Sequence, residues 1–347
     1  MKAGRQPYLY TDLHAAGEPV RILTGGAPAL SGVTLLDKRR DAMQRHDTVR
    51  RHLMLEPRGH ADMYGVWPTQ PDQAECDLAV LFMHNGGWST MCGHATVALG
   101  RWVIDQGIVQ ATPPLTTFRL QCPCGPVEVR VETDADGMTG RVGFDSVPAF
   151  AGPLDQPLQM NGHGPITVDI AYGGAYYAVV PASRLGLDLH ASPYDELIAA
   201  GRSVIAAGRE QLDIRHHGDS DLGFLYGCII TDGAGPPTST TSRNLCIFGG
   251  GQVDRSATGS GIIARLALAH ARGHIETGVA CEFAGLSGVP FSGEIRQVLA
   301  DGQVIVTATG RGYYSGEGRL WVEADDPLKA GFELPPRLAD QAGLSTI

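Results

Sequence analysis

The chain has 347 residues, 43% of them hydrophobic and 18% charged, and is long enough for two domains of about 150–170 residues. Its formal net charge is −10 without any block of Lys and Arg, so we expect no nucleic-acid partner, whereas a small zwitterionic substrate needs only a local positive site. No apolar run is long enough to span a bilayer or to act as a signal peptide, so we expect no membrane contact. The seven cysteines lack the spacing of a disulfide framework, so we expect a reducing, cytoplasmic location.

Short strands dominate the predicted elements, in keeping with 46 Gly and 22 Pro residues. Each strand-like run is bounded by Gly, Pro, Asp or Asn. The predicted strands are Val20–Thr24, Leu78–His84, Thr117–Gln121, Pro126–Glu132, Ile166–Ile170, Tyr176–Val180, Gly223–Thr231 and Gln303–Thr309. Between two of them, Cys122 and Cys124 have no second pair of metal ligands, and we expect both to be strand residues.

Three helices are predicted from the apolar pattern and from residues that begin or end helices. They run from near Cys92 to Gly107, from Tyr194 to about Leu212, and from near Thr258 to Gly273. In the middle helix Ser192 is the expected N-cap, with Pro193 in the first helical position. The glycines that close the other two helices suit the left-handed conformation of a C-terminal cap.

The first and third helices resemble each other, which indicates an internal repeat. A shift of 166 positions superposes Gly93 on Gly259, Ala98 on Ala264, and Gly107 on Gly273. Both helices are apolar nearly all round, as is typical of a helix buried inside a domain. The chain is therefore predicted to form two similar lobes, each a sheet wrapped around one central helix.

The two buried helices also begin alike, with Cys92-Gly93-His94 in one and Thr258-Gly259-Ser260 in the other. The first N–H groups of a helix have no partner within the helix and lie at the positive end of its dipole, while glycine allows a ligand to approach the backbone closely. Two such starts facing each other would hold a carboxylate. They are not a phosphate-binding loop, because no Lys follows the glycines.

Cys92 is the candidate reactive group, because a helix start favours the thiolate form of a cysteine. The plainer interpretation is a small buried apolar residue. His94 could be a packed core histidine and Asp254 a loop or capping acid. Alternatively, the two side chains could hold the amino or imino nitrogen of a substrate, which is the interpretation we favour.

At this point the chain resembles the proline racemase family. The resemblance rests on five segments in the same order, which cover about residues 8 to 325. They are Asp12-Leu13-His14-x-x-Gly17-Glu18-Pro19-x-Arg21 with Gly25-Gly26, Glu56-Pro57-Arg58-Gly59-His60-x-Asp62-Met63, Met91-Cys92-Gly93-His94, Tyr172-Gly173-Gly174-x-Tyr176-Tyr177, and Asp254-Arg255-Ser256-x-Thr258-Gly259. We assign no chemistry to His14, Glu18, Arg21, Glu56, Arg58 or His60, which we expect in loops and inter-strand hydrogen bonds.

The resemblance implies an α/β (α+β) fold of the diaminopimelate-epimerase-like class. In this fold two pseudo-symmetric lobes, each a mixed sheet or barrel around a central helix, enclose the active site between them. We expect an N-terminal lobe over residues 1–138, completed by a segment that returns at about 313–347, and a C-terminal lobe over residues 139–312. Enzymes of this kind often form homodimers, so a homodimer is possible here.

The family resemblance also implies residue roles. Cys92 is the acid or base on one face of the substrate α-carbon, and His94 and Asp254 hold the ring nitrogen. The backbone N–H groups of Gly93, His94, Gly259 and Ser260 hold the carboxylate. No metal and no organic cofactor is implied.

Thr258 departs from the racemases and epimerases of the family, which carry a second Cys there. Racemisation needs a proton-transferring group on each face of the α-carbon, and an aliphatic alcohol is far too weak an acid for that role. Members with Cys first and Thr second resemble trans-3-hydroxy-L-proline dehydratases. In that substrate the hydroxyl shares a ring face with the α-hydrogen, so Cys92 alone could serve a syn elimination that yields Δ1-pyrroline-2-carboxylate, with Thr258 as a polar wall.

Three alternatives remain open. Within the family, the chain could be a proline racemase or 4-hydroxyproline 2-epimerase that works with a substituted second site. Cys92 and His94 could instead be the pair of a cysteine hydrolase, although residues two apart at a helix start are expected to point in different directions. A binding protein for hydroxyproline-type amino acids without catalysis is the third.

Overall fold

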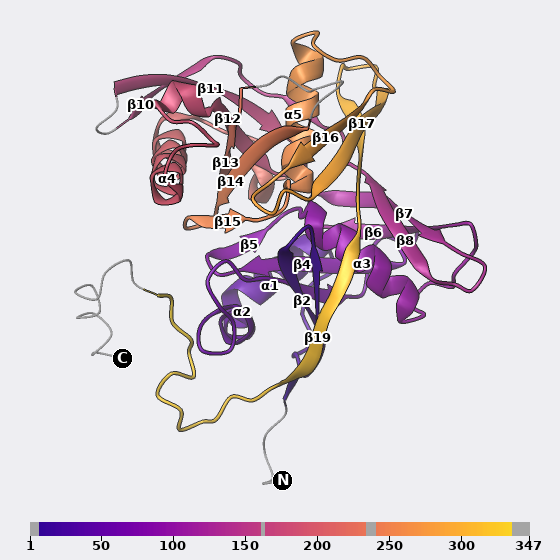
Figure 1. The fold of residues 1–347 in the computed structure, drawn as a ribbon. Coiled ribbons are helices and arrows are strands. Elements are labelled where there is room, and N and C mark those ends of the chain that lie inside the picture. Colours follow the sequence, from indigo (N-terminus) through magenta and orange to yellow (C-terminus); the bar gives the residue numbers. More distant parts are fainter. Residues whose placement is uncertain (1–6, 161–163, 234–240, 335–347) are drawn as a thin grey trace.

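The computed structural model describes residues 7–160, 164–233 and 241–334. Figure 1 shows two lobes stacked on each other, with the first part of the chain in the lower lobe. The lower, N-terminal lobe contains β1 (Tyr8–Ala15), β2 (Glu18–Gly25), β3 (Tyr64–Thr69), β4 (Leu78–His84), β5 (Gly87–Ser89), β6 (Leu115–Cys122), β7 (Gly125–Thr133), β8 (Thr139–Asp145) and β19 (Gly312–Leu320). Its helices are α1 (Leu35–Arg45), α2 (Asp47–Met54) and α3 (Gly93–Asp105).

The upper, C-terminal lobe is built from the strands that follow. They are β9 (Phe150–Ala151), β10 (Gln156–Met160), β11 (Gly164–Tyr172), β12 (Tyr176–Pro181), β13 (Leu225–Thr231), β14 (Ser242–Phe248), β15 (Gln252–Asp254), β16 (Ala280–Ala284), β17 (Pro290–Val298) and β18 (Val304–Gly310). Two α-helices, α4 (Tyr194–Gln211) and α5 (Gly259–Ala271), and two short 3₁₀ turns, Ala182–Leu185 and Ser220–Leu222, complete it.

Each lobe wraps its strands around one apolar helix, as the sequence repeat predicts. In the N-terminal lobe α3 contacts β1, β2, β7, β8 and β19, and in the C-terminal lobe α5 contacts β9, β11, β12, β17 and β18. Nearly every residue of both helices is buried. A helix that is apolar on all sides has no face for solvent, so strands must cover it on every side. These two helices therefore form the centre of the core.

Two strands connect the lobes. β8 pairs with β7 on one side and with β18 of the C-terminal lobe on the other. β19 follows β18 and runs back down to pair antiparallel with β1, as Figure 1 shows in yellow beside indigo. The predicted lobe boundaries near residues 138 and 312 stay predictions, and residues 335–347 of the predicted returning segment lie outside the described residues.

The eight predicted strands and three predicted helices are all present, but eleven strands and two α-helices of the described residues were not predicted. α1 and α2 are short, polar helices: α2 packs against β3 and β4, α1 packs against α2, and both contribute to a second, smaller apolar core. A capping box marks the start of α1, since Thr34 accepts from the Asp37 N–H and the Asp37 side chain accepts from the Thr34 N–H. That pair was a usable sequence signal.

Two local predictions were wrong. Helix α4 begins at Tyr194 with Pro193 as its N-cap, because the Ser192 hydroxyl instead accepts a hydrogen bond from the Asp188 N–H. Cys122 is a strand residue as predicted, but Cys124 lies in the turn of the β6–β7 hairpin.

Candidate functional site

The starts of α3 and α5 touch each other at the lobe interface. A Cβ atom added to Gly93 would lie 2.4 Å from Gly259 Cα, and one added to Gly259 would lie 2.7 Å from Gly93 Cα. Any side chain at either position would push the two helix starts apart. Glycine is therefore required at both for the two positive ends of the helices to face one ligand.

Both helix starts are buried and neither is capped by a side chain. Cys92 is the N-cap of α3 and Thr258 the N-cap of α5, and neither side chain accepts a hydrogen bond from the first turn. Buried N–H groups without partners are costly, and such a helix start is a ready site for an anion. The geometry suits a substrate carboxylate bound by N–H groups from both helices.

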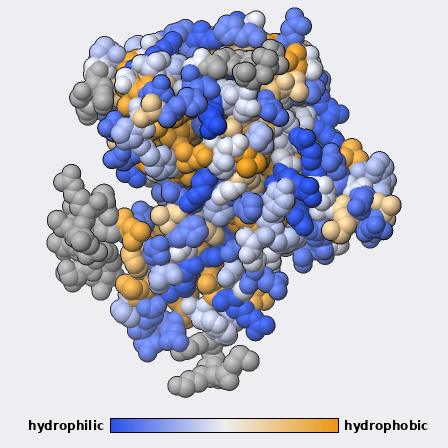
Figure 2. Space-filling model, viewed as in Figure 1, coloured by the Kyte–Doolittle hydropathy of each residue, from blue (hydrophilic) through white to orange (hydrophobic). Residues whose placement is uncertain are grey.

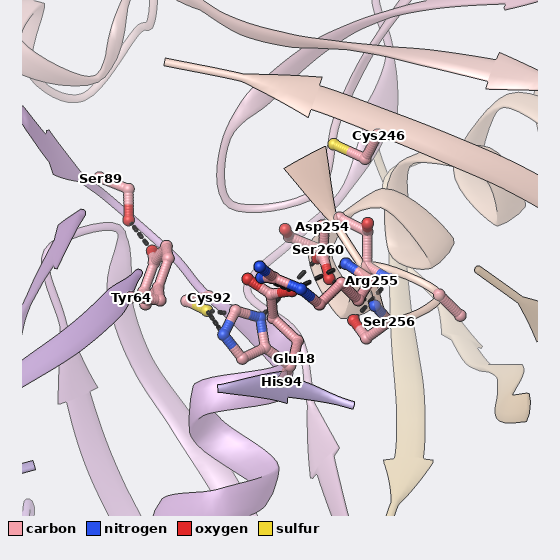
Figure 3. A network of polar contacts seen from close by, with 12 residues as sticks. Glu18, Tyr64, Ser89, Cys92, His94, Cys246, Asp254, Arg255, Ser256 and Ser260 are labelled. Carbon is pink, nitrogen blue, oxygen red and sulfur yellow. Dashed lines mark hydrogen bonds and ion pairs between the residues drawn. The ribbon is translucent and has the colours of Figure 1, made fainter. Parts of the chain in front are cut away.

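Cys92, His94 and Asp254 form one buried cluster across the interface. Cys92 Sγ lies 3.2 Å from His94 Nδ1 and 3.6 Å from His94 Nε2. The same Nδ1 lies 3.7 Å from Asp254 Oδ2, at the end of β15. Figure 3 shows the His94 ring between the Cys92 sulfur and Asp254.

The charges of this cluster support one another. Burial by itself lowers the pKa of His94, but the negative charge of Cys92 and the hydrogen bond to Asp254 outweigh it and raise the pKa well above its usual value. For Asp254, burial raises the pKa, but its interactions with His94 and Ser256 bring it below its usual value. The His94 ring therefore lies between the Cys92 sulfur and the Asp254 carboxylate, where its protonated form is favoured.

The expectation that Cys92 and His94 point in different directions was wrong. Cys92 is the extended N-cap residue, with φ −148° and ψ 111°, which turns its side chain back toward His94 in the first turn. Asp254 supplies the acid that sequence spacing did not reveal. In a hydrolase triad, however, the nucleophile and the acid use different nitrogens of the histidine ring. Here both lie nearest to Nδ1, which does not suit relay through the ring.

Thr258 lies at the same cavity as Cys92 and has a strained backbone. Its φ is 60° and its ψ 89°, a conformation that a β-branched residue rarely adopts. Its hydroxyl oxygen is buried and has no hydrogen-bond partner among the described residues. The backbone conformation, and not a hydrogen bond of the hydroxyl, therefore holds the Thr258 side chain at the cavity.

A second carboxyl group, Glu18 at the start of β2, was missed as a site residue. It is fully buried, and its Oε2 accepts hydrogen bonds from the Arg255 N–H at 2.8 Å and from Arg255 Nη1 at 3.1 Å. Its Oε1 has no partner among the described residues. Burial and the negative charge of Asp254 raise the pKa of Glu18 to about 8, against the opposing effects of His94 and Arg255. Only its place in a matched segment pointed to it.

Aromatic side chains from both lobes form the rest of the cavity wall, and sequence analysis named none of them for this role. The cavity is lined by Tyr64, Met91, Cys92, Gly93, His94, Tyr177, Tyr226, Cys246, Phe248, Asp254, Thr258 and Ser260. Tyr177 donates or accepts a hydrogen bond with the Ser260 hydroxyl at 2.7 Å. Trp67, Trp88 and Trp102 lie in the apolar cores and not at this cavity.

The predicted site residues thus meet in one place, with Gly259 in contact with Gly93. The enclosed space between them is about 10 Å³, which is room for about one water molecule. An amino acid needs more room than this conformation provides. Figure 2 shows hydrophilic and hydrophobic residues mixed on the outer surface around the lobe junction.

Two further searches covered the described residues. Among them, no group of three or more His, Cys, Asp and Glu side chains is placed to hold a metal ion. Likewise, no helix within the described ranges has the length and apolar character needed to cross a membrane.

Comparison with known proteins agrees with the architecture described above. A trans-L-3-hydroxyproline dehydratase of Saccoglossus kowalevskii is 44% identical over 93% of this chain and 100% of its own. A 3-hydroxyproline 2-epimerase of Burkholderia multivorans is 36% identical over 92% of this chain and 96% of its own. The crystal structure of a hydroxyproline epimerase from Agrobacterium vitis, with bound trans-4-hydroxy-L-proline, matches with a TM-score of 0.88 and 25% identity over 95% of each chain.

The predicted diaminopimelate-epimerase-like fold is confirmed by these similarities. The family model for proline racemase matches residues 10–333, nearly the whole chain. The chain belongs to the proline racemase family.

Proposed function

We propose that this protein dehydrates trans-3-hydroxy-L-proline to Δ1-pyrroline-2-carboxylate without a cofactor. The observation that carries the proposal is the asymmetry of the cavity, where a thiol at the tip of α3 faces an alcohol at the tip of α5. One sulfur base can serve one face of an α-carbon. The relatives named as dehydratases support the choice of substrate.

Substrate binding follows from the charges of the site. The carboxylate lies between the helix starts and accepts from the backbone N–H groups of Gly93, His94, Gly259 and Ser260. Asp254, with His94 beside it, holds the ring nitrogen. This places the α-hydrogen toward Cys92 and leaves Thr258 as a polar wall on the opposite face.

The reaction then needs only one face of the ring. The Cys92 thiolate removes the α-proton, and the helix-start N–H groups stabilise the negative charge that develops on the carboxylate oxygens. The 3-hydroxyl, on the same face, takes up the proton that Cys92 removed and leaves as water, which restores the thiolate. The resulting enamine tautomerises to Δ1-pyrroline-2-carboxylate.

The test is a coupled assay of pyrroline formation from trans-3-hydroxy-L-proline and from its 4-hydroxy isomers, with Cys92→Ser beside the wild type. We expect turnover of the 3-hydroxy substrate only, and a fall of roughly 10²–10⁴-fold in kcat for the variant. An unaffected variant, or a protein that binds hydroxyproline tightly and never turns it over, would refute the proposal.

An epimerase remains the second candidate because another thiol lines the cavity. Cys246 of β14 lies opposite Asp254 in the β14–β15 pair, next to Thr258. Burial and the charge of Asp254 raise the pKa of the Cys246 thiol well above its usual value, which makes it a poor base at neutral pH. Inversion of proline or 4-hydroxyproline in D₂O that is lost in Cys246→Ala would establish this function instead.

A cytoplasmic location and a homodimer also stay predictions. All seven cysteines are free thiols, which supports a reducing compartment.

A further inference from the structure

A group of hydroxyls lies beside Cys92 and next to the His94 ring. The hydroxyl of Tyr64, on β3, makes a short hydrogen bond with Ser89 Oγ of β5. Tyr64 lies beside Cys92 in Figure 3, and Tyr226 of the other lobe lines the same cavity as both. All of these side chains are buried. Binding of the carboxylate and of the ring nitrogen uses none of them.

The position of this group relative to the substrate can be worked out from the site. Figure 3 shows the Cys92 sulfur between Tyr64 on one side and His94 on the other. The Tyr64 and His94 rings meet edge to face with centroids 4.8 Å apart. If the ring nitrogen lies at His94 and Asp254, the opposite neighbour of the α-carbon, C3, turns toward Tyr64. A 3-hydroxyl on the Cys92 face then lies between the sulfur and the Tyr64 hydroxyl.

We propose that Tyr64 is the catalytic residue that delivers a proton to the departing 3-hydroxyl, supported by Ser89. This inference rests on the proposed dehydration and names the acid that it requires. Cys92 thereby acts as the base alone, and its proton reaches the leaving group through the Tyr64 hydroxyl.

The proton and electron balance closes without another reactant. The Cα–H electrons form the Cα–C3 double bond, and the C3–O electrons leave with oxygen. The Tyr64 O–H proton completes a water molecule, while the proton that Cys92 has taken passes from sulfur to the Tyr64 oxygen. Thiolate and neutral tyrosine are both restored.

This transfer must be concerted, because a tyrosinate is unfavourable at this position. Burial and the negative charge of Cys92 raise the pKa of Tyr64 well above its usual value. The tyrosine therefore stays a hydrogen-bond donor at every working pH and acts as a bridge between sulfur and leaving oxygen, not as a free acid.

Tyr64→Phe tests the inference, because it removes one oxygen and keeps the ring that packs on His94 and Phe248. The assay compares kcat/KM for trans-3-hydroxy-L-proline with kcat/KM for trans-3-fluoro-L-proline, since fluoride is a far weaker base than hydroxide and needs little protonation to leave. We expect water loss to fall by at least about 100-fold and fluoride loss to stay within a few-fold of wild type.

Tyr177→Phe is the matched control. It also removes a buried hydroxyl from the cavity, but one bonded to Ser260 at the carboxylate end, so both substrates should slow by the same factor. Ser89→Ala is a milder change to the same hydroxyl pair, so it should also slow water loss more than fluoride loss, by a smaller factor than Tyr64→Phe does. It tests the inference even if Tyr64→Phe folds poorly.

Unchanged water loss in Tyr64→Phe, or an equal fall for both leaving groups, would overturn the role of Tyr64. A wild-type protein that eliminates neither water nor fluoride would instead refute the proposed function, so the two failures can be told apart.

Discussion

Gly93→Ala should separate the two helix starts and disable the site while leaving the lobes folded. The added Cβ would lie 2.4 Å from Gly259 Cα and 2.9 Å from its carbonyl carbon, whereas ordinary contact begins at 3.4 Å. Both partners are backbone atoms of buried helices, so neither can rotate away. The helix starts must therefore move apart by about 1 Å.

The expected cost falls on catalysis. The carboxylate is held by N–H groups of both helices, and a misplacement of about 1 Å in a catalytic site can cost on the order of 100-fold in rate. We expect kcat/KM for trans-3-hydroxy-L-proline to fall by about that factor. The lobes themselves keep their cores, so the circular dichroism spectrum should be unchanged.

The measurement is kcat/KM together with the melting temperature, with Gly316→Ala as control. Gly316 lies on β19 with open space around its Cα, so the same substitution there meets no atom. Full activity of Gly93→Ala with an unchanged melting temperature would show that close contact of the helix starts is not what defines the site.

Two further substitutions probe Thr258 and Glu18. Thr258→Cys restores a thiol on the second face and should introduce α-hydrogen exchange and inversion of proline or 4-hydroxyproline. Incubation in D₂O with chiral chromatography measures both, and absence of both would disprove our account of position 258. Glu18→Gln should flatten the pH dependence of stability, because the folded protein holds the Glu18 proton more tightly than the unfolded chain does. That stabilisation is fully present below pH about 4.5 and is lost as the pH rises through about 8, by at most about 5 kcal/mol. Urea unfolding between pH 5 and 9 measures it, and parallel curves for both proteins would contradict the raised pKa of Glu18.

Tertiary structure decided which other side chains meet the two helix starts. Glu18, Tyr64 and Tyr226 come from β2, β3 and β13, and no spacing in the chain relates them to Cys92. Their burial, and with it the raised pKa of each, exists only once both lobes close around them. Sequence spacing gave one wrong prediction, that Cys92 and His94 point in different directions. The direction of the Cys92 side chain depends on the extended N-cap backbone, which spacing does not reveal.

What the sequence determined by itself is the local and periodic part of this protein. Apolar runs of helical length, bounded by glycine, located α3 and α5, and their similarity predicted two lobes, because a helix with no polar face must be enclosed. The Cys and Thr at corresponding positions predicted the asymmetry of the site. The walls and charges of the cavity depend on distances between strands far apart in the chain, which only the packed structure sets.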